Sequence, residues 1–190
     1  MKKIFALLIC LFTAIGLSAQ SSSKDSEHLK FMGIPLTGTI AQFHSKILAK
    51  GLKVSKYNNL IPAGGRAYTG TFLGQEAKIY VYYNTQTKIV YRAKAVYPDL
   101  SKEIAEQQYN SLKSKLIRKY PNYITFDDEG QEATSCDAFK PNEDVKLGRI
   151  DLFVTIKTPY LSLLSERSLS IDYWDEINTE KNELRELDEL

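Results

Sequence analysis

Apolar and polar residues alternate through three consecutive segments of the first half of the chain, a pattern typical of strands with one buried face. We place these strands at 66–73, 76–84 and 88–97. The connections between them are very short, and such turns join antiparallel neighbours. The three segments are therefore predicted to form a β-meander.

Two other segments have the spacing of apolar residues that is typical of helices. The first opens with a capping-box sequence, Thr39-Ile40-Ala41-Gln42, and Gly51 provides a left-handed C-terminal cap. The second is capped by Asp99 or Ser101 and runs to about Lys119. The apolar positions assigned to the buried sides are Ile40, Phe43, Ile47 and Leu48 in the first helix, and Ala105, Tyr109, Leu112 and Leu116 in the second.

Extended segments dominate the second half, at 123–126, 131–139, 149–157 and 168–174, and a short strand at 29–34 precedes the first helix. This order predicts an α+β fold built from helix plus antiparallel β-meander units. The spacing of helix starts and strands suggests two such units in tandem, although residue identity between the halves is poor. We divide the chain into a leader 1–19, a linker 20–27, units 28–98 and 99–174, and an acidic tail 175–190.

The acidic tail contains a weak helical pattern. Ile177, Leu184 and Leu187 could line one side of a short helix, but acidic residues dominate the segment. We therefore expect the tail to fray.

The first residues have the layout of a secretory signal peptide. Lys2 and Lys3 form a basic start, residues 4–15 are almost wholly apolar, and small residues precede a cleavage site before Gln20. The apolar run is too short for a membrane span, which needs about 20 residues. The sequence therefore predicts a soluble exported protein, periplasmic or secreted, with no stable membrane span.

Charge and cysteine content limit the classes of partner and chemistry. The chain has 25 Lys and Arg against 23 Asp and Glu, and Lys2 and Lys3 would leave with the leader, so the mature protein is close to neutral. Neutral charge and export disfavour nucleic acid as a partner. Cys10 also lies in the leader, so Cys136 is expected to be the only thiol of the mature chain, and burial is the commonest fate of a free cysteine.

One stretch resembles other proteins. Phe31-Met32-Gly33-Ile34-Pro35, Gly38, a helix with Phe43, and Lys50-Gly51 resemble the start of certain exported bacterial proteins without an assigned function. The helix-plus-meander layout is similar to the fold of β-lactamase-inhibitor proteins and of small outer-membrane-assembly lipoproteins. This resemblance implies protein–protein or envelope interactions rather than catalysis, and no inhibitory residue carries over.

The last two strands of the first meander carry the candidate binding surface. We assign one face to the core, with Ile79, Val81 and Tyr83 on the first strand and Ile89, Tyr91, Ala93 and Ala95 on the second. The opposite face carries Lys78, Tyr80 and Tyr82 on the first strand and Val90, Arg92, Lys94 and Val96 on the second. Tyr and Arg are enriched at interfaces, so we predict Tyr80, Tyr82, Arg92 and Lys94 as binding residues. Ordinary cross-strand contacts on a solvated sheet would also give this pattern.

Two further segments have a weaker claim to ligand binding. The loop Ile61-Pro62-Ala63-Gly64-Gly65-Arg66 could present backbone N–H groups to an anion, but it lacks a phosphate-loop signature. The turn Asp127-Asp128-Glu129-Gly130, with Glu132, could attract Ca²⁺, but it lacks the ligand spacing of an EF-hand loop. We therefore predict no metal ion and no cofactor.

Catalytic signatures are lacking in the sequence. Cys136 would need His28 or His44 as a base, and nothing in the sequence brings either histidine to it. Paired carboxylates that converge only in the folded chain stay open. Two functions follow: an exported, non-enzymatic binding module of the bacterial cell envelope with a protein or glycan partner, or alternatively a small envelope hydrolase that acts on glycan or peptide.

Overall fold

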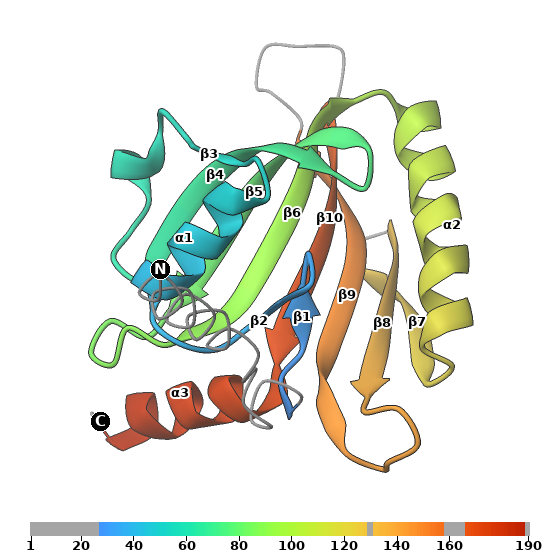
Figure 1. Cartoon of the computed structure of the whole chain (residues 1–190). Coiled ribbons are helices and arrows are strands. Elements are labelled where there is room, and N and C mark those ends of the chain that lie inside the picture. Colours follow the sequence, from blue (N-terminus) through green and yellow to red (C-terminus); the bar gives the residue numbers. More distant parts are fainter. Residues whose placement is uncertain (1–26, 129–130, 158–165, 189–190) are drawn as a thin grey trace, which may run out of the picture.

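A computed structural model describes residues 27–128, 131–157 and 166–188 of the chain. The predicted leader and nearly all of the predicted linker lie outside these residues. Within them, eight strands form one antiparallel sheet, accompanied by a two-stranded hairpin and three α-helices (Figure 1). The predicted α+β class with an antiparallel sheet is confirmed.

The large sheet has the strand order β3-β4-β5-β6-β10-β9-β8-β7. Its strands are β3 (Lys53–Val54), β4 (Gly65–Phe72), β5 (Gln75–Tyr83), β6 (Val90–Leu100), β7 (Tyr123–Asp128), β8 (Gln131–Phe139), β9 (Lys146–Lys157) and β10 (Glu166–Asp175). The strands of the two halves of the chain meet at the antiparallel pairing of β6 with β10, where Ala95 lies opposite Ile171. Both meanders thus belong to one continuous sheet, and the division into two units stays a prediction.

Helices α1 (Ile40–Ala49) and α2 (Lys102–Lys119) lie on the same side of the sheet (Figure 1). The hairpin of β1 (Lys30–Phe31) and β2 (Ile34–Pro35) lies on that side too. Helix α3 (Glu176–Asp188) follows β10 directly and crosses the end of the sheet. None of the described helices is long and apolar enough to cross a membrane. Neither α1 nor α2 covers the opposite face of the sheet, which we call the outward face.

Helix α1 begins where the capping-box sequence predicts. The Thr39 hydroxyl accepts the Gln42 backbone N–H, and the Gln42 side chain accepts that of Thr39. Gly51 has a φ of 88°, which lets the chain turn away after the helix. Ile47 is fully buried as expected, but the assignment of Leu48 to the buried side is wrong, since its side chain is 39% exposed. Leu48 is rotated by about 100° around the helix from Ile47.

Helix α2 begins at Ser101, one of the two predicted caps, whereas Asp99 belongs to β6. The Ser101 hydroxyl accepts the backbone N–H of Ile104. Tyr109 is buried and its hydroxyl bonds the Thr134 hydroxyl on β8 at 2.7 Å, which fixes the helix on the sheet. The preceding strand, β6, continues past the predicted end at residue 97 to Leu100.

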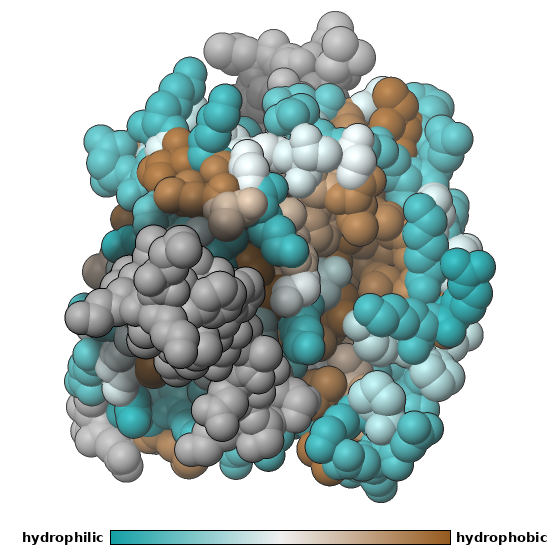
Figure 2. Space-filling view, viewed as in Figure 1, coloured by the Kyte–Doolittle hydropathy of each residue, from teal (hydrophilic) through white to brown (hydrophobic). Residues whose placement is uncertain are grey.

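The core lies between the sheet and the elements on its helix-bearing side. Eight buried aliphatic side chains of the four central strands belong to it: Ile79, Val81, Ala93, Ala95, Ile150, Leu152, Leu169 and Ile171. Phe31 of the hairpin stacks on Phe72 with ring centroids 5.1 Å apart and meets the Tyr173 ring edge-on at 5.3 Å. Apolar side chains also reach the surface between α1 and α2 on this side (Figure 2).

The segment 29–34 differs from its prediction as a single strand. Met32 and Gly33 have φ angles of 52° and 79°, so the chain reverses there and pairs Phe31 with Ile34. Two consecutive residues with positive φ are typical of the tight turns that close β-hairpins. The reversal places Phe31 in the core, where it is fully buried.

The predicted faces of the meander are wrong at the start of β6, where the structure has a β-bulge. Tyr82 pairs with Arg92 but Tyr83 pairs with Val90, so Tyr91 is the extra residue. Val90 is consequently fully buried in the core rather than on the outward face. The strict alternation assumed from the sequence fails at this one position because the bulge adds a residue to one strand only.

The segment expected to fray forms α3. Of the residues proposed for its apolar side, Ile177 is half-buried and Leu184 is 55% exposed. The buried side is polar instead, since Asn178 and Asn182 are each only 8% exposed. Asp175 begins the helix by accepting the Asn178 backbone N–H at 3.0 Å. Polar anchoring of this kind is invisible to a search for apolar periodicity.

Candidate functional site

The four residues predicted to bind a partner lie together on the outward face. Tyr80 is directly opposite Lys94, and Tyr82 is directly opposite Arg92, in the pairing of β5 with β6. All four side chains are half-buried. The alternation of the two strands therefore brings the selected residues onto one surface, as the sequence predicts.

Arg92 lies against two aromatic rings. Its guanidinium carbon is 4.6 Å from the centroid of the Tyr82 ring and 3.7 Å from that of Trp174 on β10. Arg149 on β9 approaches the Trp174 ring at 5.5 Å. Stacked cations and aromatic rings attract one another by about 0.5–2 kcal/mol per contact. We call the four residues Tyr82, Arg92, Trp174 and Arg149 the aromatic row; it crosses β5, β6, β10 and β9.

The Arg92 guanidinium also holds a buried carboxylate. Its Nε and Nη2 atoms donate to the two carboxylate oxygens of Asp172, at 2.9 and 2.5 Å. The Asp172 side chain is only 2% exposed. Burial alone would lower the pKa of Arg92, but the hydrogen bond and charge of Asp172 outweigh it and raise that pKa above its ordinary value. Arg92 therefore neutralises Asp172 and orders the face, and its charge is already compensated within the protein.

Tyr82 and Lys94 share this partly desolvated surface. Burial raises the pKa of Tyr82, so its phenol stays neutral at physiological pH and keeps its hydrogen-bonding capacity. Burial lowers the pKa of Lys94, with Asp172 opposing the shift and Arg92 adding to it. The Lys94 ammonium lies 4.6 Å from the centroid of the Phe153 ring on β9. Both side chains thus have their stems packed on the sheet and their polar ends at its surface.

The second half of the chain adds apolar residues that the sequence prediction missed. Phe126 and Ile124 on the edge strand β7 are 45% and 65% exposed. A shallow hollow of about 200 Å³ lies between β7 and β9, lined by Phe126, Phe153 and Ala133, among others. Alternation within a strand predicts only which residues of that strand share a face. Phe153 reaches Lys94, whereas β7 lies four strands from β6 at the edge of the same sheet. That both meanders share one face depends on the β6–β10 pairing, which no local pattern reveals.

Two carboxylates face each other on the outward face. Asp172 on β10 is paired directly with Asp151 on β9. Asp151 accepts hydrogen bonds from the Ser135 hydroxyl at 2.6 Å and from the Arg149 Nε at 3.1 Å. Both carboxylates are therefore bound to arginine, and Asp172 is closed off from any substrate.

Cys136 lacks the environment of a nucleophile. Its side chain is fully buried, and burial raises the pKa of the thiol to about 11. His28 bonds Asp175 at 2.9 Å, and His44 bonds the Tyr68 hydroxyl at 3.0 Å. Both histidines are engaged elsewhere, so the arrangement does not activate the thiol.

The acidic turn considered as a calcium site is only partly described. Glu129 and Gly130 lie outside the described residues, and Glu132 forms an ion pair with Lys113 at 2.7 Å. Across residues 27–128, 131–157 and 166–188, His, Cys, Asp and Glu side chains form no group of three that could hold a metal ion.

Comparisons with known proteins give no match: no protein family, no curated protein sequence and no solved structure is significantly similar to the chain. The resemblance to β-lactamase-inhibitor proteins and outer-membrane-assembly lipoproteins stays a prediction. The function must therefore be argued from the geometry of the outward face.

Proposed function

We propose that the chain is an exported, non-enzymatic binding module of the bacterial cell envelope, which contacts a protein or glycan partner through the outward face. The basic start and apolar run at the beginning of the sequence support export. The proposed contact residues are Tyr80, Tyr82 and Lys94, and Arg92 orders this surface by stacking on the Tyr82 ring.

The observation that carries the proposal is the aromatic row. Tyr82, Arg92, Trp174 and Arg149 hold one another in place through stacked contacts across four strands. Side chains that are already ordered lose little conformational entropy when a partner arrives, so more of the contact energy appears as affinity. Tyr, Trp and Arg are also the residues that most often dominate binding energy at interfaces.

The apolar residues on β7 extend the same surface. Phe153 lies against Lys94, and Phe126 and Ile124 continue the hydrophobic part of the face to its edge at β7. A protein interface of ordinary size combines such an apolar centre with polar surroundings. The shape is that of a shallow surface, which suits a macromolecular partner better than a small substrate.

The alternative function, hydrolysis of glycan or peptide by paired carboxylates, has one observation in its favour. Asp172 and Asp151 are directly opposed on neighbouring strands. A carboxyl acid catalyst must reach its substrate and must carry a proton, whereas Asp172 is buried and bound by Arg92. The arrangement supports a structural role for both carboxylates, and the binding module is the better-supported proposal.

Affinity capture tests the proposed face. The protein, residues 20–190, is immobilised and exposed to envelope extract of the source organism, untreated or digested with proteinase. The face variant is Tyr80→Ala/Tyr82→Ala, which removes two contact residues and leaves the ion pair of Arg92 with Asp172 intact. The matched control is Leu48→Ala/Ile104→Ala, which removes two exposed apolar side chains from α1 and α2.

The proposal predicts a component that the native protein and the α1/α2 control retain and the face variant loses. Sensitivity of that component to proteinase identifies a protein partner, and resistance identifies a glycan. Retention by the face variant, or loss from the control alone, would place the binding site on the helix-bearing side and overturn the proposal. Circular dichroism and urea unfolding of each variant separate loss of binding from loss of fold.

A further inference from the structure

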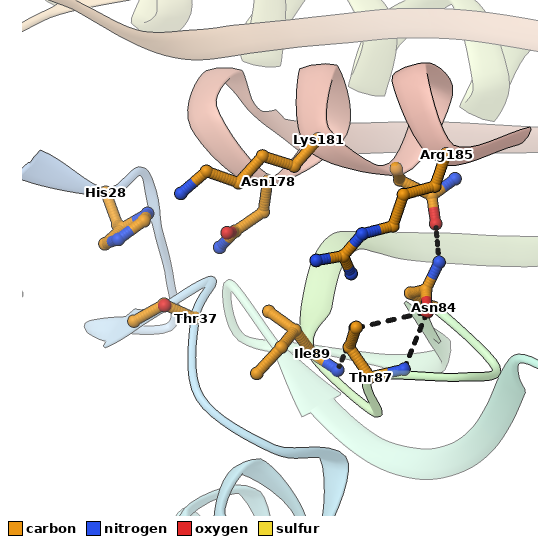
Figure 3. A pocket seen from close by; sticks show the side chains of 9 residues that line it. His28, Thr37, Asn84, Thr87, Ile89, Asn178, Lys181 and Arg185 are labelled. Atoms are coloured by element: carbon orange, nitrogen blue, oxygen red, sulfur yellow. Dashed lines mark hydrogen bonds between the residues drawn. The ribbon is translucent and has the colours of Figure 1, made fainter. Parts of the chain in front are cut away.

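A second candidate site lies at the end of the sheet, away from the centre of the outward face. A pocket of about 280 Å³ opens between α3 and the loops that lead into α1 and β6 (Figure 3). Its lining contains His28, Lys181 and Arg185 together with asparagine and threonine side chains, and the described lining includes no carboxylate. The pocket is therefore polar and basic.

Helix α3 forms one wall and is held rigidly. The Asn178 amide nitrogen donates to the carbonyl oxygens of Leu36 and Val90, at 2.9 and 3.3 Å. The Asn182 side-chain oxygen accepts the amide N–H of Asn84 at 2.9 Å. These buried amides tie the helix to the loop before α1 and to the loop before β6. The wall of the pocket is thus ordered without any ligand.

Two cations extend from this wall into the pocket. Lys181 and Arg185 are one helical turn apart, and Figure 3 shows Lys181 directed towards His28 and Arg185 towards Thr87. Among the described residues, neither cation has a carboxylate partner. Like charges four residues apart on a helix repel each other weakly, and an anion bound between Lys181 and Arg185 would relieve that repulsion.

The opposite wall is fixed by an asparagine-centred turn. The Asn84 side-chain oxygen accepts the backbone N–H of Thr87 at 2.8 Å and that of Gln86 at 3.0 Å. The Thr87 hydroxyl donates to the same oxygen at 3.1 Å. This network orients the Asn84 amide nitrogen towards Asn182 on α3. The hydrogen bond between these two side chains joins both sides of the pocket.

A tyrosine-lined hollow adjoins the basic pocket and shares Asn84, Asn182 and Arg185 with it. This hollow also measures about 280 Å³ and is lined by Tyr82, Tyr83 and Tyr91. Arg185 therefore stands between a basic pocket and an aromatic one.

The loop 61–65 lines one side of the tyrosine-lined hollow. The Gly64 carbonyl accepts the backbone N–H of Tyr83 at 2.8 Å, and Gly64 has a φ of 87°. A Cβ atom at Gly64 would lie only 3.1 Å from the Tyr83 carbonyl oxygen. This is the glycine loop that the sequence suggested as an anion cradle; it lines the tyrosine-lined hollow together with Arg185 of α3.

We propose that the two adjoining hollows form one binding site for an anionic sugar. The carboxylate or phosphate group of the sugar lies between Lys181 and Arg185, and its ring packs against the tyrosines. Small-molecule pockets have volumes of about 300 Å³ or more, so each hollow has room for one part of the ligand, either its anionic group or its sugar ring. Charge-assisted hydrogen bonds from Lys and Arg provide selection for the anion. The site shares Tyr82 with the outward face but goes beyond the proposed function, since the anion is held by Lys181 and Arg185 of α3, which the proposed partner contact does not use.

Ligand-observed NMR titration of the protein, residues 20–190, tests the site with four probes: glucuronic acid, glucose 6-phosphate, glucose and inorganic phosphate. We expect at least one of the two anionic sugars to bind with a dissociation constant of about 1 mM or less, and glucose and phosphate to bind at least about tenfold more weakly. The preferred anionic sugar tells a carboxylate-bearing ligand from a phosphate-bearing one.

The variant Lys181→Gln/Arg185→Gln is expected to lose binding of the anionic sugar by at least about tenfold. The control Lys115→Gln/Arg118→Gln removes two exposed cations from α2 and should leave binding unchanged. Equal affinity for glucose, or retained binding in the α3 variant, would overturn the anionic part of the proposal. Equal affinity for inorganic phosphate would overturn the sugar part, and no binding of either anionic sugar at about 10 mM would overturn the site as a whole.

Discussion

At the scale of single residues, the outward face depends on the ion pair between Arg92 and Asp172. The guanidinium stacks on Trp174 while it donates two hydrogen bonds to a carboxylate that is almost completely buried. A buried ion pair contributes little net stability, but removal of one partner leaves an uncompensated charge. Arg92 is therefore an ordering residue of the face, and its neighbours Tyr80, Tyr82 and Lys94 are the ones free to contact a partner.

The losses of stability from the two single substitutions in this pair should not add up in the double variant. Arg92→Leu and Asp172→Leu should each lower the free energy of unfolding by about 3 kcal/mol, because each leaves one buried charge unmatched. The double variant should lose less than either single variant, because no unmatched charge is left in it. Urea unfolding of the four proteins measures the coupling. Costs that add up in the double variant would show that the pair is not coupled.

Cys136 should make stability depend on alkaline pH. Burial raises the pKa of the folded thiol to about 11, against an ordinary value of 9.0, so the unfolded chain releases the proton first. The contribution is complete below pH 9 and is lost as pH rises from 9 towards 11, by at most about 1.4 kcal/mol per pH unit. Unfolding by urea between pH 8 and 10 should show this slope, to which the tyrosines with raised pKa values add as pH approaches their ordinary value of 10.0.

The variant Cys136→Ala provides the control for the pH dependence. It should be less stable at every pH because a buried side chain is shortened, but its stability should change less between pH 8 and 10. An identical slope in the variant and in the native protein would assign the pH dependence to other groups.

At the scale of whole elements, α3 shows that a helix can be anchored by polar contacts. Asp175, at the junction of β10 and α3, is fully buried and accepts three hydrogen bonds. Asn178 and Asn182 continue the anchoring along the helix. The helix in turn positions Lys181 and Arg185, so the proposed anion site depends on this polar junction.

Asp175→Ala should destabilise the protein by at least about 2 kcal/mol, because the buried N–H groups of Leu29 and Asn178 lose their acceptor. Hydrogen exchange should show the greatest loss of protection in α3 and in the residues next to Leu29. Asp144→Ala, at an exposed position, serves as the control and should change stability by less than about 0.5 kcal/mol. A small effect of Asp175→Ala on both measurements would contradict the role of this junction.

Strand β9 requires a glycine where it passes β10. Gly148 has a φ of 154°, and a Cβ atom there would lie 2.0 Å from the Trp174 carbonyl oxygen. Gly148→Ala should therefore cost about 3 kcal/mol or more, since backbone atoms must move apart. Gly74→Ala is the matched control, with positive φ but open space around it, and should cost only about 1–2 kcal/mol. Equal unfolding free energies for the two variants would refute the steric argument.

At the scale of the whole molecule, sequence patterns predict which elements form better than they predict which elements lie side by side. Capping at Thr39 and Ser101, alternation in β5 and the turn at Gly74 are local features, and their predictions agree with the structure. The hairpin at Met32 and the bulge at Tyr91 depend on φ angles and pairings that an alternating pattern does not encode.

Long-range pairing explains why the candidate site was predicted only in part. Arg92 and Asp172 are separated by 80 residues, and they meet only because β6 pairs with β10. Trp174 joins the face through the same pairing, and Phe153 joins it through the pairing of β10 with β9. The proposed anion site has no sequence signature, because Lys181 and Arg185 look like counterions of an acidic segment until α3 is anchored by its asparagines.

Photo-crosslinking in the source organism tests the outward face most directly. A photoreactive amino acid is placed at Tyr80 on the outward face, and separately at Ile104 on α2, in the full-length protein. We predict a specific crosslinked partner from position 80 and none from position 104. A crosslink from position 104 alone, or no specific crosslink from position 80 in correctly folded protein, would contradict the account of the outward face as the binding surface.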